Sequence, residues 1–308
     1  MKLAAARELK RTLRDTFGRL GVSIASGIGL TTTSHFRVAI LLHDENDRRL
    51  LRHPSVRRAM AAARGEIDVR VIGAIEACSG ISSSPQPDTM LRIGASVGHH
   101  NGGVGSVGFF ATRRSDNKIG LVSCNHVIAL ADRGVDGDTI VSPSMLDGGD
   151  VERDAVATLD GTYPTLGGAG PKVADCAFAA LREGVRYDAS RFSPEPAEIV
   201  EQLAVVKLGR VTGLRRGVVL NIEVDNVAVR YGSVRAIFND VIEIGSASRV
   251  KFSEYGDSGA LVISEQTRQP VGLIFATAYV GGPFDAGVTW VNPITHVTTA
   301  LNVDLVTG

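Results

Sequence analysis

One stretch of the sequence places a hydroxyl nucleophile in a setting suited to acyl transfer. Ser258 stands between glycines, in Gly-Asp-Ser-Gly at residues 256–259, directly before an apolar run. A tight turn there would aim the backbone N–H groups of Gly256 and Ser258 at one point beside the hydroxyl, as a tetrahedral oxyanion requires. A serine hydroxyl is inert alone, because a base must take its proton and a third group must orient that base.

Two residues upstream could serve as that base and that third group. His126 follows the run Gly-Leu-Val-Ser-Cys-Asn, and Asp175 lies inside the apolar stretch Val-Ala-Asp-Cys-Ala-Phe. A buried carboxylate needs a hydrogen-bond partner. An imidazole N–H is one such partner, and the pair would hold His126 in the tautomer that accepts the Ser258 proton.

The elements that must position these residues are mostly strands. The chain has 308 residues, of which 44% are hydrophobic, 21% charged and 5% aromatic, with 35 glycines. This composition excludes a disordered, collagen-like or coiled-coil chain. After residue 90, short apolar runs alternate with Gly, Asp and Asn turns, which predicts antiparallel barrels or sandwiches. These runs are 106–111, 120–123, 217–224, 241–244, 260–263 and 271–275.

The N-terminal residues predict a small α/β unit. In residues 4–20, the side chains of Leu9, Leu13, Phe17 and Leu20 share one face of a helix. A strand over 36–42, a helix over 54–63 and an alternating run over 67–75 follow. We expect the apolar stripe of the first helix to pack on its own domain; docking to a membrane surface or a partner is the alternative.

Composition breaks divide the chain into four parts. A Ser- and Pro-rich run without periodicity predicts a linker at 81–90, after the N-terminal unit of residues 1–80. A second break at 190–197 separates a first β lobe, 91–195, from a second, 196–308. Residues 1–90 carry a net charge of +5 and the remainder −5. His126 and Asp175 then belong to the first lobe, and Ser258 to the second.

The overall charge and the cysteines indicate the compartment. Lys and Arg together equal Asp and Glu, at 33 each, so no basic footprint for nucleic acid exists. Three cysteines without close spacing, Cys78, Cys124 and Cys176, form neither a disulfide framework nor a four-cysteine zinc site. The first twenty residues contain six basic and two acidic side chains, and the apolar runs are too short to span a bilayer. We therefore expect a cytoplasmic protein.

The three motifs together resemble a known family. Ser-Cys-Asn-His-Val, Val-Ala-Asp-Cys-Ala and Gly-Asp-Ser-Gly, in this order, resemble those of chymotrypsin-like serine peptidases over about residues 97–308. The chain is most similar to the disulfide-free, trypsin-like domains of bacteria and plants that carry an N-terminal α/β unit. The resemblance implies a mainly β fold with two antiparallel six-stranded barrels and a site in the cleft between them. It also implies that no cofactor or metal is required.

The same resemblance assigns individual roles. Ser258 would be the nucleophile, His126 the general base and Asp175 the orienting carboxylate, with oxyanion donors from the amides of Gly256 and Ser258. Six residues before the nucleophile, where trypsin-type enzymes carry an aspartate, this chain has Phe252. With Phe275, Ala276 and Thr277, it would line a specificity pocket for an apolar or small substrate side chain.

Activation is open at this stage. In zymogen-type relatives, the residue before the nucleophile, here Asp257, pairs with an amino terminus released by cleavage. The segment Arg70–Ala74 resembles such a cleavage site only faintly, because it continues the alternating run of the N-terminal unit. The alternative is that Asp257 finds a local hydrogen-bond partner.

Several other patterns have simpler interpretations. His99 and His100 suggest a metal site, but adjacent strand residues point to opposite faces and no Cys or carboxylate pair accompanies them, which favours a loop near the active cleft. Cys124 and Cys176 flank the catalytic candidates, either as small buried hydrophobes or as a redox-sensitive pair. His296 fits a terminal helix better than a second base.

The sequence thus predicts an intracellular serine endopeptidase that cleaves protein or peptide substrates. Residues 1–90 would regulate access, docking or assembly, through a regulatory partner or a homo-oligomer. The alternatives are a catalytically silent binding module on a protease fold and a scaffold protein. An esterase of the α/β-hydrolase type is disfavoured, because that fold places its nucleophile before the acid and the histidine.

Overall fold

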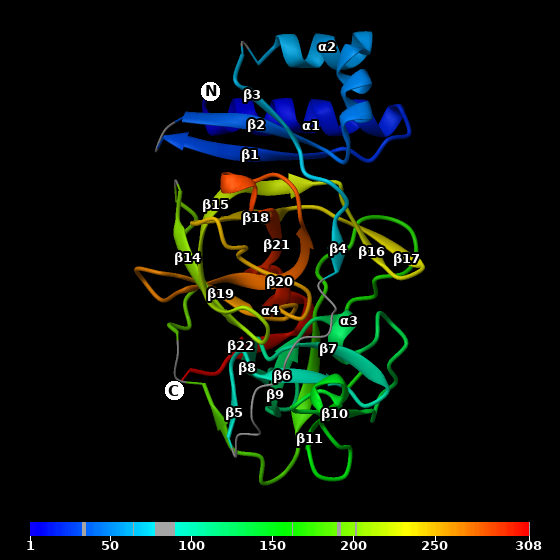
Figure 1. Cartoon of the computed structure of the whole chain (residues 1–308), viewed down its shortest axis with the longest axis vertical. Helices are drawn as coiled ribbons and strands as arrows, with labels where there is room; N and C mark the ends of the chain where they lie inside the picture. The colour runs from blue at the N-terminus through cyan, green and yellow to red at the C-terminus, as the bar shows by residue number, and fades with distance from the viewer. Residues whose placement is uncertain are drawn as a thin grey trace.

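The computed structural model describes residues 1–32, 35–63, 65–77, 90–161, 163–189, 192–200 and 202–307. It is mainly β and two-lobed, as predicted, with an α/β layer at the top of the view in Figure 1. Cys78 and all of the predicted linker except Met90 lie outside the described residues. Within the described part of the chain, no helix is both long and apolar enough to cross a membrane.

The N-terminal layer contains the elements that the sequence predicts. Its six elements are α1 (Leu3–Arg19), β1 (Ala25–Thr32), β2 (His35–Leu42), the 3₁₀-helix η1 (Glu45–Arg52), α2 (Pro54–Ala61) and β3 (Ile67–Val71). Leu9, Leu13 and Phe17 of α1 are buried in one apolar cluster with Ile40 of β2 and Val56 of α2. The apolar stripe of the first helix therefore packs on its own layer, as expected.

The second lobe is a closed barrel of six strands. They are β14 (Ala204–Gly209), β15 (Gly213–Asp225), β18 (Val241–Ser246), β19 (Leu261–Ser264), β20 (Pro270–Ala278) and β21 (Val288–Pro293). Each strand pairs with the next in the order β20-β19-β14-β15-β18-β21, and β21 returns to β20. Closure pairs both edges of every strand, which leaves the polar backbone groups of the barrel satisfied.

The first lobe is a curled sheet of eight strands. Their order is β22 (Val303–Leu305), β8 (Phe109–Arg113), β9 (Ile119–Ser123), β12 (Ala177–Leu181), β11 (Ala155–Leu159), β10 (Thr139–Val141), β6 (Ser96–His99) and β7 (Gly102–Ser106). The expected run 106–111 is broken at 107–108, between β7 and β8.

This sheet curls into a half-barrel, consistent with the expected two-barrel fold, and both of its outer edges have partners. The C-terminal strand β22 pairs with β8. At the other end, Ser106 of β7 donates its N–H to the carbonyl of Ser258 in the second lobe, at 2.7 Å. Among the described strands, β7 and β8 therefore do not pair with each other.

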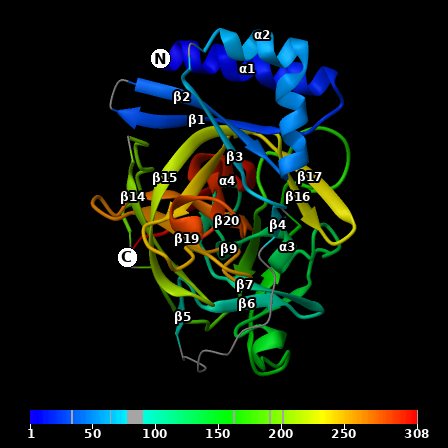
Figure 2. The same cartoon turned by 45° about the horizontal axis from the view of Figure 1, so that its top comes forward.

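The N-terminal layer is continuous with the second lobe. β1 pairs antiparallel with β15, with Ile28 opposite Ile222, so the barrel sheet extends into the layer. Ion pairs reinforce this seam, including Arg7 with Glu223 at 2.6 Å. Figure 2 shows β1 lying directly against the long, bent β15. Whether residues 1–80 form a separate domain stays a prediction.

The remaining elements are short helices and strands. They are β4 (Glu76–Ala77), β5 (Leu91–Arg92), α3 (Asn125–Ile128), η2 (Met145–Asp147), β13 (Tyr187–Asp188), β16 (Val227–Tyr231), β17 (Val234–Phe238), η3 (Pro283–Asp285) and α4 (Ile294–Leu301). His296 lies on α4, as predicted, and its ring is 3.2 Å from Asp240.

Candidate active site

His126 lies on the single helical turn α3, immediately after β9. The whole turn is buried. The side-chain amide of the preceding Asn125 holds the turn in place, because it donates to Asp132 at 2.7 Å and to the carbonyl of Pro164 at 2.9 Å. Tyr231, from the β16–β17 hairpin, lies against the imidazole with the ring centroids 5.3 Å apart. These contacts fix the position of the histidine before any ligand arrives.

Asp175 is fully buried and forms two hydrogen bonds with His126. Its carboxylate lies 2.5 Å from Nδ1 of the imidazole and accepts the backbone N–H of the same residue at 3.2 Å. Nδ1 must carry the proton in this pair, because an ionised carboxylate can only accept. Nε2 is then the basic nitrogen, and it is buried without a hydrogen-bond partner among the described residues. The structure thus forms the predicted histidine–carboxylate pair.

Ser258 lies across the lobe interface from α3, in the loop between β18 and β19. A methyl group built on Gly105 of β7 would lie 2.5 Å from the carbonyl oxygen of Ser258 and 2.6 Å from Val127. Only a glycine at position 105 therefore lets the serine loop lie this close to α3. The serine hydroxyl donates to the carbonyl of Phe275 at 3.4 Å and makes no hydrogen bond with His126.

The loop before Ser258 has the shape expected for an oxyanion site. Gly256 has a positive φ of 97°, and a methyl group there would lie 2.2 Å from the guanidinium of Arg210. Only glycine adopts this conformation in this space without strain. Within the described residues, the N–H groups of Gly256 and Ser258 have no hydrogen-bond acceptor. Both amides can therefore receive a substrate oxygen.

Asp257 forms a buried ion pair within the second lobe. Its carboxylate lies 2.9 Å from the ammonium of Lys207, and both side chains are fully buried. The carboxylate also accepts from the backbone N–H groups of Val211, Thr212 and Glu254 and from the Thr212 hydroxyl. Asp257 thus has the local partners that the sequence analysis gave as the alternative to a released amino terminus. Arg70, in the faint cleavage motif, lies in strand β3.

A second buried ion pair joins the two lobes beside this loop. Arg210 of the second lobe pairs with Asp147 of the first, and both side chains are buried. Burial favours the neutral acid, but the hydrogen bonds from Arg210 and Ser96 outweigh it and lower the pKa of Asp147. Sequence reasoning singled out neither Arg210 nor Lys207.

The four residues predicted to line a specificity pocket are all buried near Ser258. Phe252 packs in the core of the second barrel, and the rings of Phe275 and Phe238 lie tilted against each other with centroids 4.7 Å apart. Ala276 and Thr277 continue β20 beyond Phe275, and the Thr277 hydroxyl donates to the carbonyl of Val288. Their role as a pocket wall stays a prediction.

The two described cysteines, Cys124 and Cys176, are buried and form no disulfide. Cys124 donates its thiol to the carbonyl of Ile274 at 3.1 Å. Burial, with a smaller contribution from the charge of Asp175, raises the pKa of the Cys176 thiol well above its usual value. Since the thiolate is the reactive form, Cys176 behaves as a small hydrophobe.

One argument about His99 and His100 was wrong. Their rings stack with centroids 4.4 Å apart rather than pointing to opposite faces, because β6 ends at His99 and His100 belongs to the following turn. A carboxylate is also present: Asp138 lies 2.8 Å from Nε2 of His99. Nδ1 of His99 accepts from the amide of Asn101, so both of its ring nitrogens already have protein partners. Burial lowers the pKa of His99.

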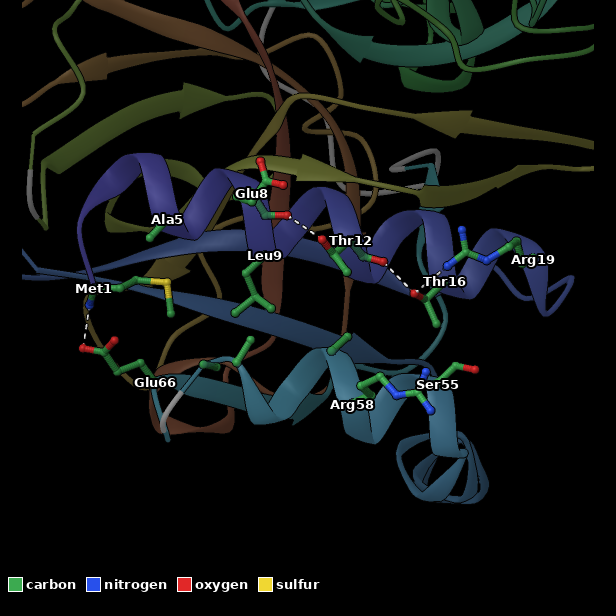
Figure 3. A pocket seen from close by; sticks show the side chains of 13 residues that line it. Met1, Ala5, Glu8, Leu9, Thr12, Thr16, Arg19, Ser55, Arg58 and Glu66 are labelled. Carbon is green, nitrogen blue, oxygen red and sulfur yellow. Dashed lines mark hydrogen bonds and ion pairs between the residues drawn. The ribbon is translucent and has the colours of Figure 1, made fainter.

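A cavity of about 440 Å³ contains His126 in its wall, together with Tyr231 of the β16–β17 hairpin and Ala77 of β4. A larger one, of about 780 Å³, lies between α1 and α2 (Figure 3). The second is lined by Leu9 and several alanines, with the ion pair of the Met1 amino group and Glu66 at one end. No histidine is among the described residues that line this larger cavity, whereas His126 lines the smaller one.

Comparison with known proteins gives similarity at the level of structure. No protein-family model and no curated protein matches the sequence. Among solved structures, protease A of Thermobifida fusca covers 71% of this chain and 100% of its own, at 18% identity and a TM-score of 0.48. The Nocardiopsis protease covers 70% and 99%, at 21% identity and a TM-score of 0.48. The chymotrypsin of Cellulomonas bogoriensis covers 71% and 99%, at 18% identity and a TM-score of 0.48.

Proposed function

We propose that this protein is a serine endopeptidase, with Ser258 as nucleophile, His126 as general base and Asp175 as the orienting acid. The observation that carries the proposal is the buried His126–Asp175 pair, in which Nε2 of the imidazole has no hydrogen-bond partner among the described residues. A histidine kept in this tautomer is prepared to take a proton from a hydroxyl.

The reaction would proceed by acyl transfer. The Ser258 hydroxyl leaves the carbonyl of Phe275 by rotation about its side-chain bond, which costs little because a hydrogen bond of 3.4 Å is weak. Ser258 then attacks a peptide carbonyl while Nε2 of His126 takes its proton. The N–H groups of Gly256 and Ser258 stabilise the developing oxyanion. His126 gives the proton to the leaving amine, and water hydrolyses the acyl-enzyme.

A substrate pocket and a location complete the proposal. Phe252, Phe275, Ala276 and Thr277 would form a wall that accepts apolar or small side chains, since all are buried and Phe275 contacts Ser258. Cleavage of a diverse peptide library tests this wall, and a preference for Arg or Lys would contradict it. Cys124 and Cys176 are buried and form no disulfide, which supports a reducing, cytoplasmic location. Residues 1–80 would be a regulatory or docking unit ahead of the linker at 81–90.

The test is covalent labelling with an active-site fluorophosphonate. We expect the wild type to be labelled at Ser258, and Ser258→Ala to be unlabelled although folded. Ser264→Ala is the matched control. This serine is also buried, lies on β19, and its hydroxyl accepts the amide of Thr267. We therefore expect Ser264→Ala to be labelled like the wild type.

A catalytically silent binding module is the second candidate. One observation favours it, because the Ser258 hydroxyl bonds Phe275 rather than His126. Folded wild-type protein that resists the fluorophosphonate would establish this alternative and reject the peptidase.

A further inference from the structure

The short strand β4 occupies a particular place beside the candidate nucleophile. Along one edge of β20, β19 pairs with residues 270–273, and β4 pairs antiparallel with Ala276 and Thr277. Between these two strands, the amide of Gly259 donates to the carbonyl of Ile274 and the Ser258 hydroxyl donates to that of Phe275. The serine therefore lies directly beyond the end of β4.

β4 belongs to the segment that descends from the N-terminal layer. The chain leaves β3 at the top of Figure 1 and runs down to β4, which lies between β16 and β20. Ala77, its last residue, is buried and lines the same cavity as His126. Because the pairing is antiparallel, an extended peptide lying where β4 lies would place its next residue opposite Phe275 and Ser258.

The Glu76 side chain has a dedicated partner in this arrangement. The hydroxyl of Tyr255, which precedes Gly256, donates to its carboxylate. Tyr255 packs edge-on against Tyr279 with centroids 5.1 Å apart, and the ammonium of Lys251 lies 4.3 Å from the centre of the Tyr279 ring. The Glu76 carboxylate is thus bound by a phenol whose ring packs against Tyr279, while the Lys251 ammonium also pairs with Glu254 at 3.3 Å.

The cavity beyond β4 also favours negative charge. Its described lining includes the cations Arg133 and Arg230, and none of the described residues there is a carboxylate. Both arginines are exposed at its rim, where they can pair with an incoming acidic side chain. Charge of one sign around a cleft selects for the opposite sign in what it binds.

We infer that the β20 edge beside Ser258 is a binding edge for extended, acidic peptides, and that β4 fills it as an occupant supplied by the chain itself. Unpaired strand edges bind extended peptides through main-chain hydrogen bonds, while side-chain contacts give the specificity. A substrate must therefore displace β4 and place an acidic side chain where Glu76 lies, against Tyr255. Cleavage of that peptide rests on the proposed function; its binding does not.

Peptide binding tests the inference without turnover. The full-length Ser258→Ala chain is titrated into a fluorescein-labelled peptide, Ile-Gly-Ala-Ile-Glu-Ala, which copies residues 72–77. Glu76→Lys weakens β4 by removing the hydrogen bond with Tyr255, so we expect it to bind the peptide about tenfold more tightly than the chain with Glu76 intact. Glu76→Gln should increase the affinity for the peptide by a smaller factor. It replaces Glu76→Lys in the test if that variant does not fold.

Three controls make the result specific. Glu8→Lys reverses a charge on the exposed face of α1 and should leave peptide affinity unchanged. A peptide with Gln in place of Glu should bind Glu76→Lys about tenfold more weakly than the Glu peptide. Adding Tyr255→Phe should abolish that difference. The inference is overturned if Glu76→Lys, Glu76→Gln and the chain with Glu76 intact bind the Glu peptide with equal affinity. It is also overturned if Glu76→Lys binds the Glu and Gln peptides equally.

Labelling separates this inference from the proposed function. With Ser258 present, Glu76→Lys should react faster with the fluorophosphonate than the wild type or Glu8→Lys. If the peptide binds as predicted but no variant is labelled, the peptidase proposal fails and the binding edge stands. If labelling occurs at an equal rate in all variants and the peptide does not bind, the peptidase proposal stands and β4 is not an occupant of the site.

Discussion

Asp175 in the first β lobe and Asp257 in the second are both fully buried carboxylates, and the two differ in their partners. Asp175 in the first lobe is bound to the imidazole of His126. Asp257 in the second lobe is bound to the ammonium of Lys207 and to three backbone amides. The first pair is suited to proton transfer. The second is a fixed charge pair that holds the nucleophile loop.

From this contrast we expect Asp175 to act on turnover and Asp257 to act on stability. Loss of Asp175 should greatly lower turnover with little loss of stability. Loss of Lys207, the partner of Asp257, should lower the free energy of unfolding with a smaller effect on turnover. Four substitutions test this contrast, given from the largest expected effect to the smallest.

Asp175→Asn should have the largest effect on activity. The amide keeps the shape of the carboxylate but favours the wrong imidazole tautomer, so turnover of a peptide substrate should fall about 10⁴-fold. Steady-state kinetics measures this fall, and thermal unfolding checks that the melting temperature is little changed. A variant that retains a tenth of wild-type turnover would show that Asp175 does not orient the base.

Gly256→Ala should lower turnover by about 10²- to 10³-fold, comparable to the loss of one oxyanion donor. The added methyl group meets the Arg210 guanidinium and forces a positive φ on a residue that disfavours it, so the amide turns away. The measurement is kcat at saturating peptide. Gly213→Ala is the control, since that glycine also has a positive φ but no atom lies near its Cβ position.

Lys207→Met should act on stability. Removing one member of a fully buried pair leaves the Asp257 charge uncompensated, which costs about 3–5 kcal/mol of unfolding free energy. Urea unfolding measures the loss, and Lys207→Met with Asp257→Asn should recover part of it. Arg114→Met breaks an exposed pair with Asp304 and should leave the unfolding free energy unchanged. Equal stability of Lys207→Met and wild type would contradict the structural role.

Asp147→Asn should lower the free energy of unfolding at neutral pH, and its difference from the wild type should shrink in acid. The pKa of Asp147 is lower in the folded protein than in the unfolded chain, so its contribution is present above about pH 4 and is lost as pH falls through the lowered value. The wild type should therefore lose stability more steeply than Asp147→Asn below about pH 4. Parallel acid unfolding curves for the two proteins would show that the inter-lobe pair makes no pH-linked contribution.

The candidate site was largely predictable because its signals are local. The sequence alone shows that Ser258 lies between glycines and that Asp175 lies in an apolar run. The same signal was present for Lys207, a charged residue inside the apolar strand Ala204–Gly209, but it was not used. A buried charge in an apolar strand predicts a buried partner whichever sign it carries.

The parts that the sequence did not predict depend on pairings between distant residues. β22 completes the edge of the first sheet, and β1 extends the barrel through β15. β4 has only two residues and no alternation, so nothing local indicates that it pairs beside Ser258. Such contacts depend on which strand edges the rest of the fold leaves open, and that is decided only when the lobes close.

The crystal structure of the wild-type protein after reaction with a fluorophosphonate tests the central claim most directly. We predict phosphorus bonded to the oxygen of Ser258, Nε2 of His126 about 3 Å from that oxygen, and the phosphoryl oxygen accepting the N–H groups of Gly256 and Ser258. An adduct on another residue, or Nε2 still without contact to the adduct, would contradict it.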